Sequence, residues 1–295
     1  MKPKLLGILY AIIAPFFYGL LPLFWRFVPL PTEHLIGFRC LFTFITLGTI
    51  LLITRQWDTL RHFSGTLITK VAKSAFYLTL HLGFFMGAIS LGYQVEAAIG
   101  MFLAPAATAI LAAIFLNEKL NPLKYFCVAI SVCAAMIFFH EAHQFPRFAP
   151  LIALTWGGYL CQRKDALKEV DNPISYSWLE QSLIAGVLIL IFLYRVSAVN
   201  SQALTAVNGN AFLVLGGGCA LATIASFLQA KASQIIDCAQ VGMLGVISPV
   251  VQFGIAVLID QKPVSLLQGS AILLLLIAVV IYNCPPLNPI VSKAN

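Results

Sequence analysis

The sequence has few charged residues for its length, and this shortage excludes a water-soluble globular protein. Of its 295 residues, 10% are charged and 60% are hydrophobic, and the mean hydropathy is +0.92. A soluble domain has about 25% charged residues, which it needs to cover its surface. The chain is therefore predicted to lie in a lipid bilayer.

Motifs for nucleotides and metals are also missing. The sequence has no GxxxxGK[ST] loop for ATP, and HEAH at 140–143 lacks the HExxH spacing that places two histidines on one zinc ion. The glycines of GGGC at 216–219 stand inside an apolar run, where they favour close helix packing over phosphate binding. The sequence therefore predicts no cofactor, no metal and no ATP hydrolysis by this chain.

The cysteines show no paired motif. They stand singly in or at the ends of apolar runs without a CxxC spacing, so we expect small packing residues and neither disulfides nor metal ligands. They are Cys40, Cys127, Cys133, Cys161, Cys219, Cys238 and Cys284.

Long apolar runs account for most of the chain. A bilayer core about 30 Å thick is crossed by roughly 20 apolar residues in a helix, and ten runs of this kind fit the sequence. The N-terminal run is as long as a full span and has no small-residue cleavage site behind it, so we interpret it as a span and not as a signal peptide. The predicted spans are 5–25, 34–54, 73–92, 96–116, 123–140, 147–163, 173–194, 210–230, 238–259 and 264–283.

Basic residues set the predicted orientation, because short cytoplasmic loops collect Lys and Arg. With both termini in the cytoplasm, only Arg26, Arg147, Arg195 and Lys262 fall on the outer side. The net charge of +7 then reflects inner loops that face anionic lipid, and no nucleic-acid partner is expected. The residues predicted on the cytoplasmic side are Lys2, Lys4, Arg55, Arg61, Lys70, Lys73, Lys119, Lys124, Arg163, Lys164, Lys168, Lys231 and Lys293.

Two stretches of the chain resemble each other. AAIGMFLAPAATAILAAIFLNEK at 97–119 aligns with AQVGMLGVISPVVQFGIAVLIDQK at 239–262, and each carries a proline in mid-span, Pro105 or Pro249. Helix-bending prolines are tolerated in spans that line a cavity. The sequence thus predicts an all-α polytopic membrane protein with ten transmembrane helices as two five-helix repeats, 1–143 and 144–295. Because five is odd, the repeats are inverted, and inverted repeats place a binding cavity at their interface near the midplane.

These motifs resemble a known family. GMFLAPAATAILAAIFLNEKL and SPVVQFGIAVLIDQKP look like the helix ends of the EamA-type drug/metabolite transporter superfamily. FFYGLLPLFW, EHLIGFRCLFTF, VEAAIGMFLAPA and SYSWLEQSL look most like its RarD-like branch. The resemblance implies a bacterial inner-membrane carrier that exports amino acids, related metabolites or amphipathic drugs. An exchanger or importer of a nucleoside-like metabolite is the alternative within the same superfamily.

One arginine stands inside a predicted span, and its repeat counterpart is an acid. Arg39 and Glu180 are separated by the same 141 residues as Tyr18 and Tyr159. A charge in mid-membrane is costly and normally faces a wet interior or a partner. We therefore predict that Arg39 and Glu180 are two poles of one substrate cavity, not a permanent ion pair. The structural alternatives are that Arg39 reaches the outer surface or a backbone carbonyl, and that Glu180 is a packing partner.

Further polar and aromatic residues at matched or mid-span positions are predicted to line this cavity, with helix packing as the alternative for each of them. They are Tyr18, His81, Trp156, Tyr159, Gln252 and Phe253.

Two functional classes fit a polytopic membrane protein. An intramembrane enzyme needs a convergent nucleophile, acid/base pair or metal cluster, and the polar residues of this sequence are sparse and scattered. A secondary carrier of a small organic solute is favoured, driven by a coupled proton, by a counter-substrate or by the solute's own gradient. We expect it to work as a monomer or a homodimer in the bilayer.

Overall fold

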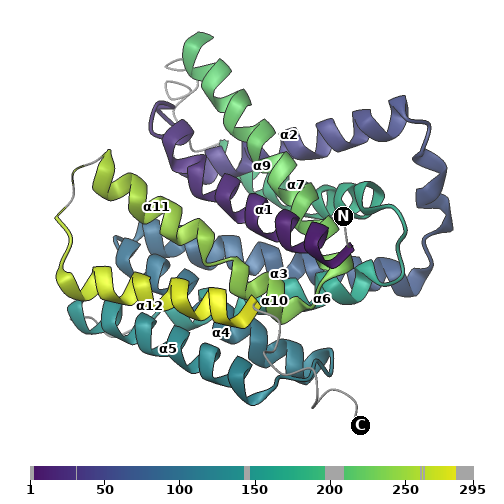
Figure 1. Ribbon diagram of the computed structural model, residues 1–295. Coiled ribbons are helices and arrows are strands. Elements are labelled where there is room, and N and C mark those ends of the chain that lie inside the picture. Colours follow the sequence, from purple (N-terminus) through teal and green to yellow (C-terminus); the bar gives the residue numbers. More distant parts are fainter. Residues whose placement is uncertain are drawn as a thin grey trace, which may run out of the picture.

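The computed structural model describes residues 3–30, 32–142, 147–196, 209–259, 261 and 263–283. All regular structure within these residues is helical, without a strand (Figure 1), which confirms the all-α prediction. The helices are α1 (Pro3–Trp25), α2 (Thr32–Ile53), the 3-10 turn η1 (Trp57–His62), α3 (Gly65–Ser90), α4 (Gln94–Phe115), α5 (Pro122–Ala142), α6 (Ala149–Leu167), α7 (Pro173–Val196), α9 (Gly209–Ile235), α10 (Cys238–Leu244), α11 (Ile247–Leu258) and α12 (Leu266–Asn283).

Among the described residues, seven helical segments are long and apolar enough to cross a membrane. The long helices α3, α6 and α7 are not among the seven, and they carry charged side chains such as Lys73, Arg163 and Glu180. The seven segments are Pro3–Trp25, His34–Ile53, Gln94–Phe115, Pro122–His140, Gly209–Ile235, Cys238–Leu258 and Leu266–Asn283.

Two helices extend well beyond the apolar spans predicted for them. Helix α3 begins at Gly65 and not at residue 73, because Ser64 caps it by accepting a hydrogen bond from the Leu67 amide at 3.1 Å. Helix α6 continues to Leu167, past the predicted end at residue 163. Hydropathy marks only the apolar part of a helix, whereas the backbone hydrogen bonds continue through polar residues. Arg163 therefore lies inside a helix.

The predicted span 238–259 is broken in the structure. Helix α10 ends at Leu244 and α11 begins at Ile247. Pro249 has no N–H to donate to the Gly245 carbonyl, which instead accepts from the Ser248 amide at 3.1 Å. The corresponding Pro105 lies inside the uninterrupted helix α4. The N–H group that proline lacks thus coincides with a break in the helix at Pro249, in the second half of the chain, but not at Pro105, in the first half.

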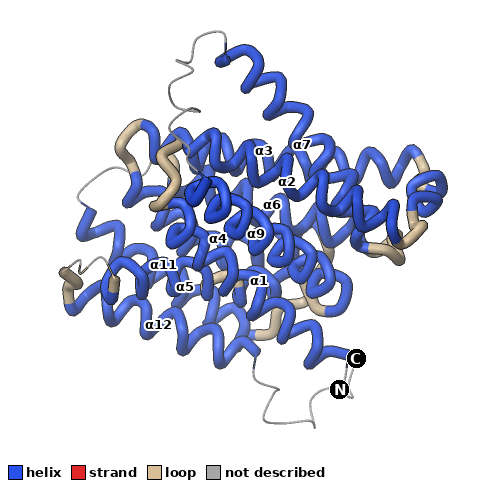
Figure 2. The backbone as a smooth tube through the Cα atoms, turned by 90° about the horizontal axis from the view of Figure 1, so that it is seen from above, coloured by secondary structure: helices blue, strands red, loops and turns tan. Residues whose placement is uncertain are grey.

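The helices of the first half pack mainly against helices of the second half. Helix α1 lies along α9 and α11, α6 lies against α3 and α4, α2 against α7, and α5 against α12. Figure 1 shows α5 and α12 side by side, and the view from above in Figure 2 shows the long helices packed together with short loops between them. Helices α3, α6, α7 and α9 meet in the interior, where they bring together polar side chains from both halves.

Two of the glycines permit close approaches between these helices. A Cβ atom on Gly19 would lie 2.6 Å from Cβ of Val251, so α1 and α11 touch there. A Cβ atom on Gly157 would lie 2.9 Å from the Thr108 amide nitrogen, so α6 and α4 touch in the same way. Small residues at helix contacts are the usual means of tight packing in membranes, where lipid is as apolar as the side chains.

Candidate functional site

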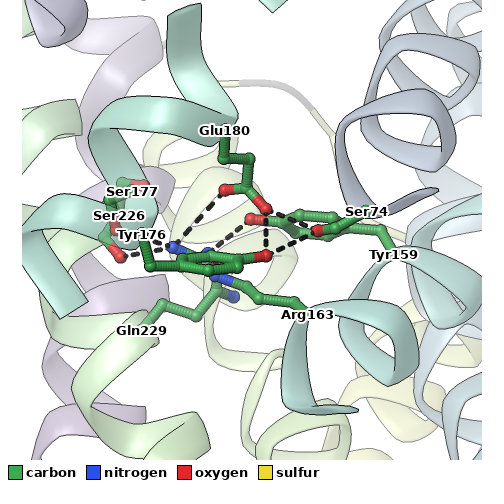
Figure 3. Close-up of polar contacts among 8 residues, drawn as sticks. All are labelled: Ser74, Tyr159, Arg163, Tyr176, Ser177, Glu180, Ser226 and Gln229. Atoms are coloured by element: carbon green, nitrogen blue, oxygen red, sulfur yellow. Dashed lines mark hydrogen bonds and ion pairs between the residues drawn. The ribbon is translucent and has the colours of Figure 1, made fainter. Parts of the chain in front are cut away.

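An ion pair is buried in the interior of the bundle. Glu180 of α7 and Arg163 of α6 are both 0% exposed, and Oε2 of Glu180 lies 3.7 Å from Nη2 of Arg163. In Figure 3 the carboxylate and the guanidinium point toward one another. The partner of Glu180 is therefore Arg163. The sequence had placed Arg163 at the cytoplasmic end of a span, whereas in the structure it lies within α6 and is fully buried.

Four further groups hold the Arg163 guanidinium. Nη1 donates to the Tyr159 hydroxyl and to Oε1 of Gln229, the latter at 3.2 Å. Nη2 donates to the Ser226 carbonyl at 3.1 Å and to the Ser177 hydroxyl at 3.5 Å. The guanidinium carbon also lies 5.4 Å from the centre of the Tyr159 ring. These contacts replace water around a charge that would otherwise be very costly to bury.

Two hydroxyl groups hold the Glu180 carboxylate. The Ser74 hydroxyl of α3 donates to Oε1 at 2.5 Å, and the Tyr176 hydroxyl donates to the same oxygen at 2.6 Å. All three side chains are buried. The carboxylate is thus matched by one cation and two donors, and it joins α3 to α7.

The network as a whole ties together four helices, α3, α6, α7 and α9 (Figure 3). Removing one partner of a buried ion pair leaves the other charge uncompensated and costs about 3–5 kcal/mol. The network is therefore positioned to hold these helices in one arrangement. Its members are Ser74, Tyr159, Arg163, Tyr176, Ser177, Glu180, Ser226 and Gln229.

Arg39 has a different environment. It lies on α2 and is only partly buried, and its guanidinium carbon is 5.2 Å from the centre of the Tyr18 ring on α1. Within the described part of the chain, Arg39 makes no ion pair and no hydrogen bond to a side chain. Its charge interacts electrostatically with His81 of α3 and Tyr159 of α6, which are 5% and 2% exposed. Arg39 is therefore partly enclosed by the bundle, with the Tyr18 ring beside it.

A row of three tilted aromatic rings leads to Arg163. The His81 ring is 4.9 Å from the Trp156 ring, and Trp156 is 5.3 Å from Tyr159, whose hydroxyl reaches Arg163. Nδ1 of His81 lies 3.1 Å from the Ile152 carbonyl, which can only accept a hydrogen bond. The structure thus brings together Tyr18, Arg39, His81, Trp156 and Tyr159, all of which the sequence had singled out.

The chain resembles known transporters. The model of the EamA-like transporter family matches residues 5–140. The uncharacterized transporter YojE of Bacillus subtilis is 23% identical over 268 residues, which cover 88% of this chain and 87% of YojE. Protein RarD of Escherichia coli (strain K12) is 23% identical over 263 residues, which cover 87% of each chain. Over residues 5–140 the chain is thus similar to the EamA-like transporter family, and over most of its length it is similar to RarD proteins.

A solved crystal structure has the same fold. Its TM-score against this EamA-type protein is 0.73 at 16% identity, and the match covers 94% of this chain and 96% of the other. The RarD relatives place the protein in the RarD-like branch, as its motifs predicted. It is accordingly a multi-pass membrane transporter that acts on small molecules in a lipid bilayer.

The two remaining residues that the sequence predicted for the cavity, Gln252 and Phe253, both lie on α11. The Gln252 amide donates to the Ser248 hydroxyl within α11 at 3.2 Å, and the Phe253 ring packs on Phe138 of α5 at 6.4 Å. Neither makes a described contact with the Arg163 network or with Arg39. Within the described ranges, no group of three or more His, Cys, Asp or Glu side chains is placed to hold a metal ion.

The sequence missed Arg163, Tyr176 and the polar residues of α9. A signal was present, because Arg163 follows Tyr159 by one helical turn and Tyr176 precedes Glu180 by one turn. Side chains four residues apart share a helix face. Treating Arg163 as the end of a span hid this pattern.

Proposed function

We propose that this EamA-type protein is a secondary transporter that moves a small organic metabolite by alternating access, as an exporter across the bacterial inner membrane. The solute, amino acid-like or amphipathic, binds beside Arg39 between α1, α2, α3 and α6. The observation that carries the proposal is a charge that is partly enclosed by a membrane bundle without a counter-ion among the described residues. Intramembrane charges of this kind mark substrate pathways.

The helix contacts support two inverted five-helix repeats, 1–143 and 144–295. If α6, α7, α9, α10–α11 and α12 repeat α1 to α5, contacts between the halves are expected to be reciprocal. Helix α1 packs on α9 and α11, and its counterpart α6 packs on α3 and α4; α2 and α5 each pack on their own counterparts, α7 and α12. A pseudo-twofold axis in the membrane plane produces this pairing.

We further propose that α3, α6 and α7 also span the membrane, which gives ten spans with both termini in the cytoplasm. Cysteine labelling tests this topology at two exposed loop positions, Leu91 and Lys168. A membrane-impermeant maleimide added outside intact cells is expected to modify Leu91→Cys and to spare Lys168→Cys until the membrane is permeabilised. Labelling of Lys168→Cys from outside would overturn the topology.

In this orientation the two arginines lie at different depths. Arg39 is seven residues from the start of α2, roughly 10 Å below the outer end of the helix, and Arg163 is four residues from the end of α6, roughly 6 Å above its inner end. The Arg163 network would then close the inner side of the pathway while Arg39 faces the solute. Alternating access requires this network to open and the helices on the outer side to close.

Transport by purified protein in liposomes tests the function. Labelled amino acids, amphipathic drugs and nucleosides are supplied outside the vesicles, with and without an imposed proton gradient or an internal counter-solute. We expect uptake of at least one organic solute that exceeds uptake by protein-free vesicles. Vesicles that transport none of these classes under any gradient contradict the proposal.

A further inference from the structure

We infer that the solute bound beside Arg39 is an organic anion with an aromatic or otherwise apolar body, and not a zwitterion or a cation. This inference rests on the proposed function, since it specifies the substrate class of the same site. Its basis is the charge balance among the described side chains in the middle of the bundle, where Arg39 and Arg163 stand against Glu180, because the other buried acid, Glu96, lies in the first turn of α4. Arg163 and Glu180 compensate each other, which leaves one positive charge over.

Glu180 is not available to the ammonium group of a zwitterionic solute. Its Oε1 already accepts from Ser74 and Tyr176, its Oε2 faces Arg163, and its side chain is 0% exposed. A solute ammonium would have to displace the guanidinium, which leaves a buried Arg163 without a counter-ion. The two-pole site predicted from Arg39 and Glu180 therefore lacks an accessible negative pole.

The other described carboxylates are engaged or lie at helix ends. Glu96 accepts the amides of Arg147 and Phe148 at 2.6 Å each, where it caps α6. Glu118 accepts the amides of Cys238 and Ala239 at 2.6 and 3.0 Å, where it caps α10. The remaining acids whose side chains the structure describes, Asp58, Asp165, Glu169, Asp171 and Asp237, lie in loops, in the 3-10 turn or in the last turn of α6.

The groups beside Arg39 fit an aromatic body. Tyr18 covers one face of the guanidinium, which leaves its N–H groups as donors for a carboxylate. Trp156, which is only partly buried, supplies an aromatic surface for such a body, and the buried rings of His81 and Tyr159 pack against it. A second proton on His81 would only increase the positive excess, so the preference for an anion holds for either state of this side chain.

A matched series of probes tests the inference directly. N-acetylphenylalanine, phenylalanine, phenylalaninamide and N-acetylphenylalaninamide share one skeleton and are respectively an anion, a zwitterion, a cation and a neutral molecule at pH 7.4. The same four derivatives of tryptophan form a second series. Binding to purified protein in nanodiscs is measured by isothermal titration calorimetry. We expect the anion in at least one series to bind at least tenfold more tightly than its three relatives.

Variants connect the preference to Arg39. Loss of one partner of a desolvated charge pair is expected to weaken binding of the anion by about 30-fold or more in Arg39→Gln. Binding of the neutral diamide is expected to stay within threefold, and Arg39→Lys to keep part of the affinity for the anion. Arg61→Gln is the matched control, because Arg61 is 78% exposed on the 3-10 turn and pairs with the similarly exposed Asp58. It is expected to bind all four probes as the parent protein does.

Three results would overturn the inference: a zwitterion or cation that binds as tightly as the anion in both series, an anion whose affinity does not change in Arg39→Gln, or no binding of either anion. Transport assays separate this failure from failure of the proposed function. Uptake of phenylalanine but not of its N-acetyl derivative refutes the anion preference and leaves the transporter intact. Arg39-dependent binding of the anion without uptake of any solute refutes transport and leaves the anion site intact.

Discussion

Two arginines lie inside the bundle, and their surroundings differ in almost every respect. Arg163 is fully buried, paired with Glu180 and bonded to groups from α6, α7 and α9. Arg39 is partly buried and has the Tyr18 ring as its neighbour, without a described carboxylate beside it. The same side chain thus occupies one environment in which protein groups bind both terminal nitrogens, with only Nε left without a described partner, and one that leaves its donors available.

This difference separates a structural role, in which the arginine stabilises the helix packing, from a role in binding a ligand. A charge that is paired with protein groups stabilises the one helix arrangement in which the partners meet. This stabilisation is lost when the helices rearrange. A charge without a protein partner leaves its donors to a ligand or to water. We therefore expect changes at Arg163 to act first on stability and changes at Arg39 to act first on transport.

The largest effect is expected at Arg163. In Arg163→Gln the buried Glu180 loses its counter-ion, and the free energy of unfolding is expected to fall by about 3–5 kcal/mol. Chemical unfolding of the purified protein in detergent measures this change. The double variant Arg163→Gln with Glu180→Gln removes both charges, so its loss is expected to be clearly smaller than the sum of the two single losses.

The exposed pair of Arg61 and Asp58 is the control, and its neutralisation is expected to leave stability unchanged. Additive losses at Arg163 and Glu180 would mean that the two charges do not stabilise each other.

The next effect is expected at Arg39 and has the opposite character. Arg39→Gln is expected to stay within about 1 kcal/mol of the stability of the parent protein, because only the cation–π contact with Tyr18 is lost and an embedded charge is removed. Uptake at low solute concentration is expected to fall about 30-fold or more, in line with the loss of a desolvated charge contact to the solute. Liposome uptake and detergent unfolding on the same preparation check both halves of this prediction. A strongly destabilised Arg39→Gln with full transport would reverse the roles of the two arginines.

The helical fold could be predicted from the sequence because lipid leaves few alternatives. Runs of about 20 apolar residues must form helices that satisfy their own backbone. Nine of the ten predicted runs each coincide with one helix in the structure, and the run 238–259 is divided between α10 and α11. The extent of α6 and the break before α11 could not be read from hydropathy. Both depend on backbone hydrogen bonds that continue through Arg163 and fail at Pro249, whatever the polarity of the side chains.

The partners of the charged residues were harder to predict. The repeat offset singled out Glu180 but suggested Arg39 as its complement, because both occupy one position of the repeat. Ion pairs depend on which helix faces meet, and Arg163 comes from the neighbouring α6, with its support from α9. The aromatic residues beside Arg39 were found because they stand at matched or mid-span positions, which needs no knowledge of the packing.

A smaller effect is expected at the two prolines, where the halves of the chain also differ. Pro249→Ala restores the N–H that α11 lacks and favours one continuous helix from α10 to α11, so we expect several-fold slower uptake if the break serves as a bending point. Pro105→Ala lies in a helix that is already continuous, and we expect a weaker effect on uptake there. Both variants are expected to insert normally, which surface labelling checks. Equal slowing in both would show that the break before Pro249 has no special role.

The smallest and most selective effect is expected at the two matched tyrosines. The Tyr159 hydroxyl accepts a hydrogen bond from Arg163, whereas no described group bonds the Tyr18 hydroxyl and its ring alone contacts Arg39. Removing the hydroxyl in Tyr159→Phe is expected to lower the free energy of unfolding by about 1.5–3 kcal/mol, the range for hydrogen bonds to charged groups. Tyr18→Phe keeps the ring and is expected to change neither stability nor uptake.

Tyr18→Leu removes the aromatic face and is expected to weaken binding of an anionic solute by about two- to fivefold, because a cation–π contact at a partly exposed site contributes about 0.5–1 kcal/mol. Unfolding in detergent and calorimetry on the same variants measure the two quantities. A Tyr18→Phe variant that loses stability as Tyr159→Phe does would show that Arg39 is held by a network of its own, and the contrast between the two arginines would then disappear.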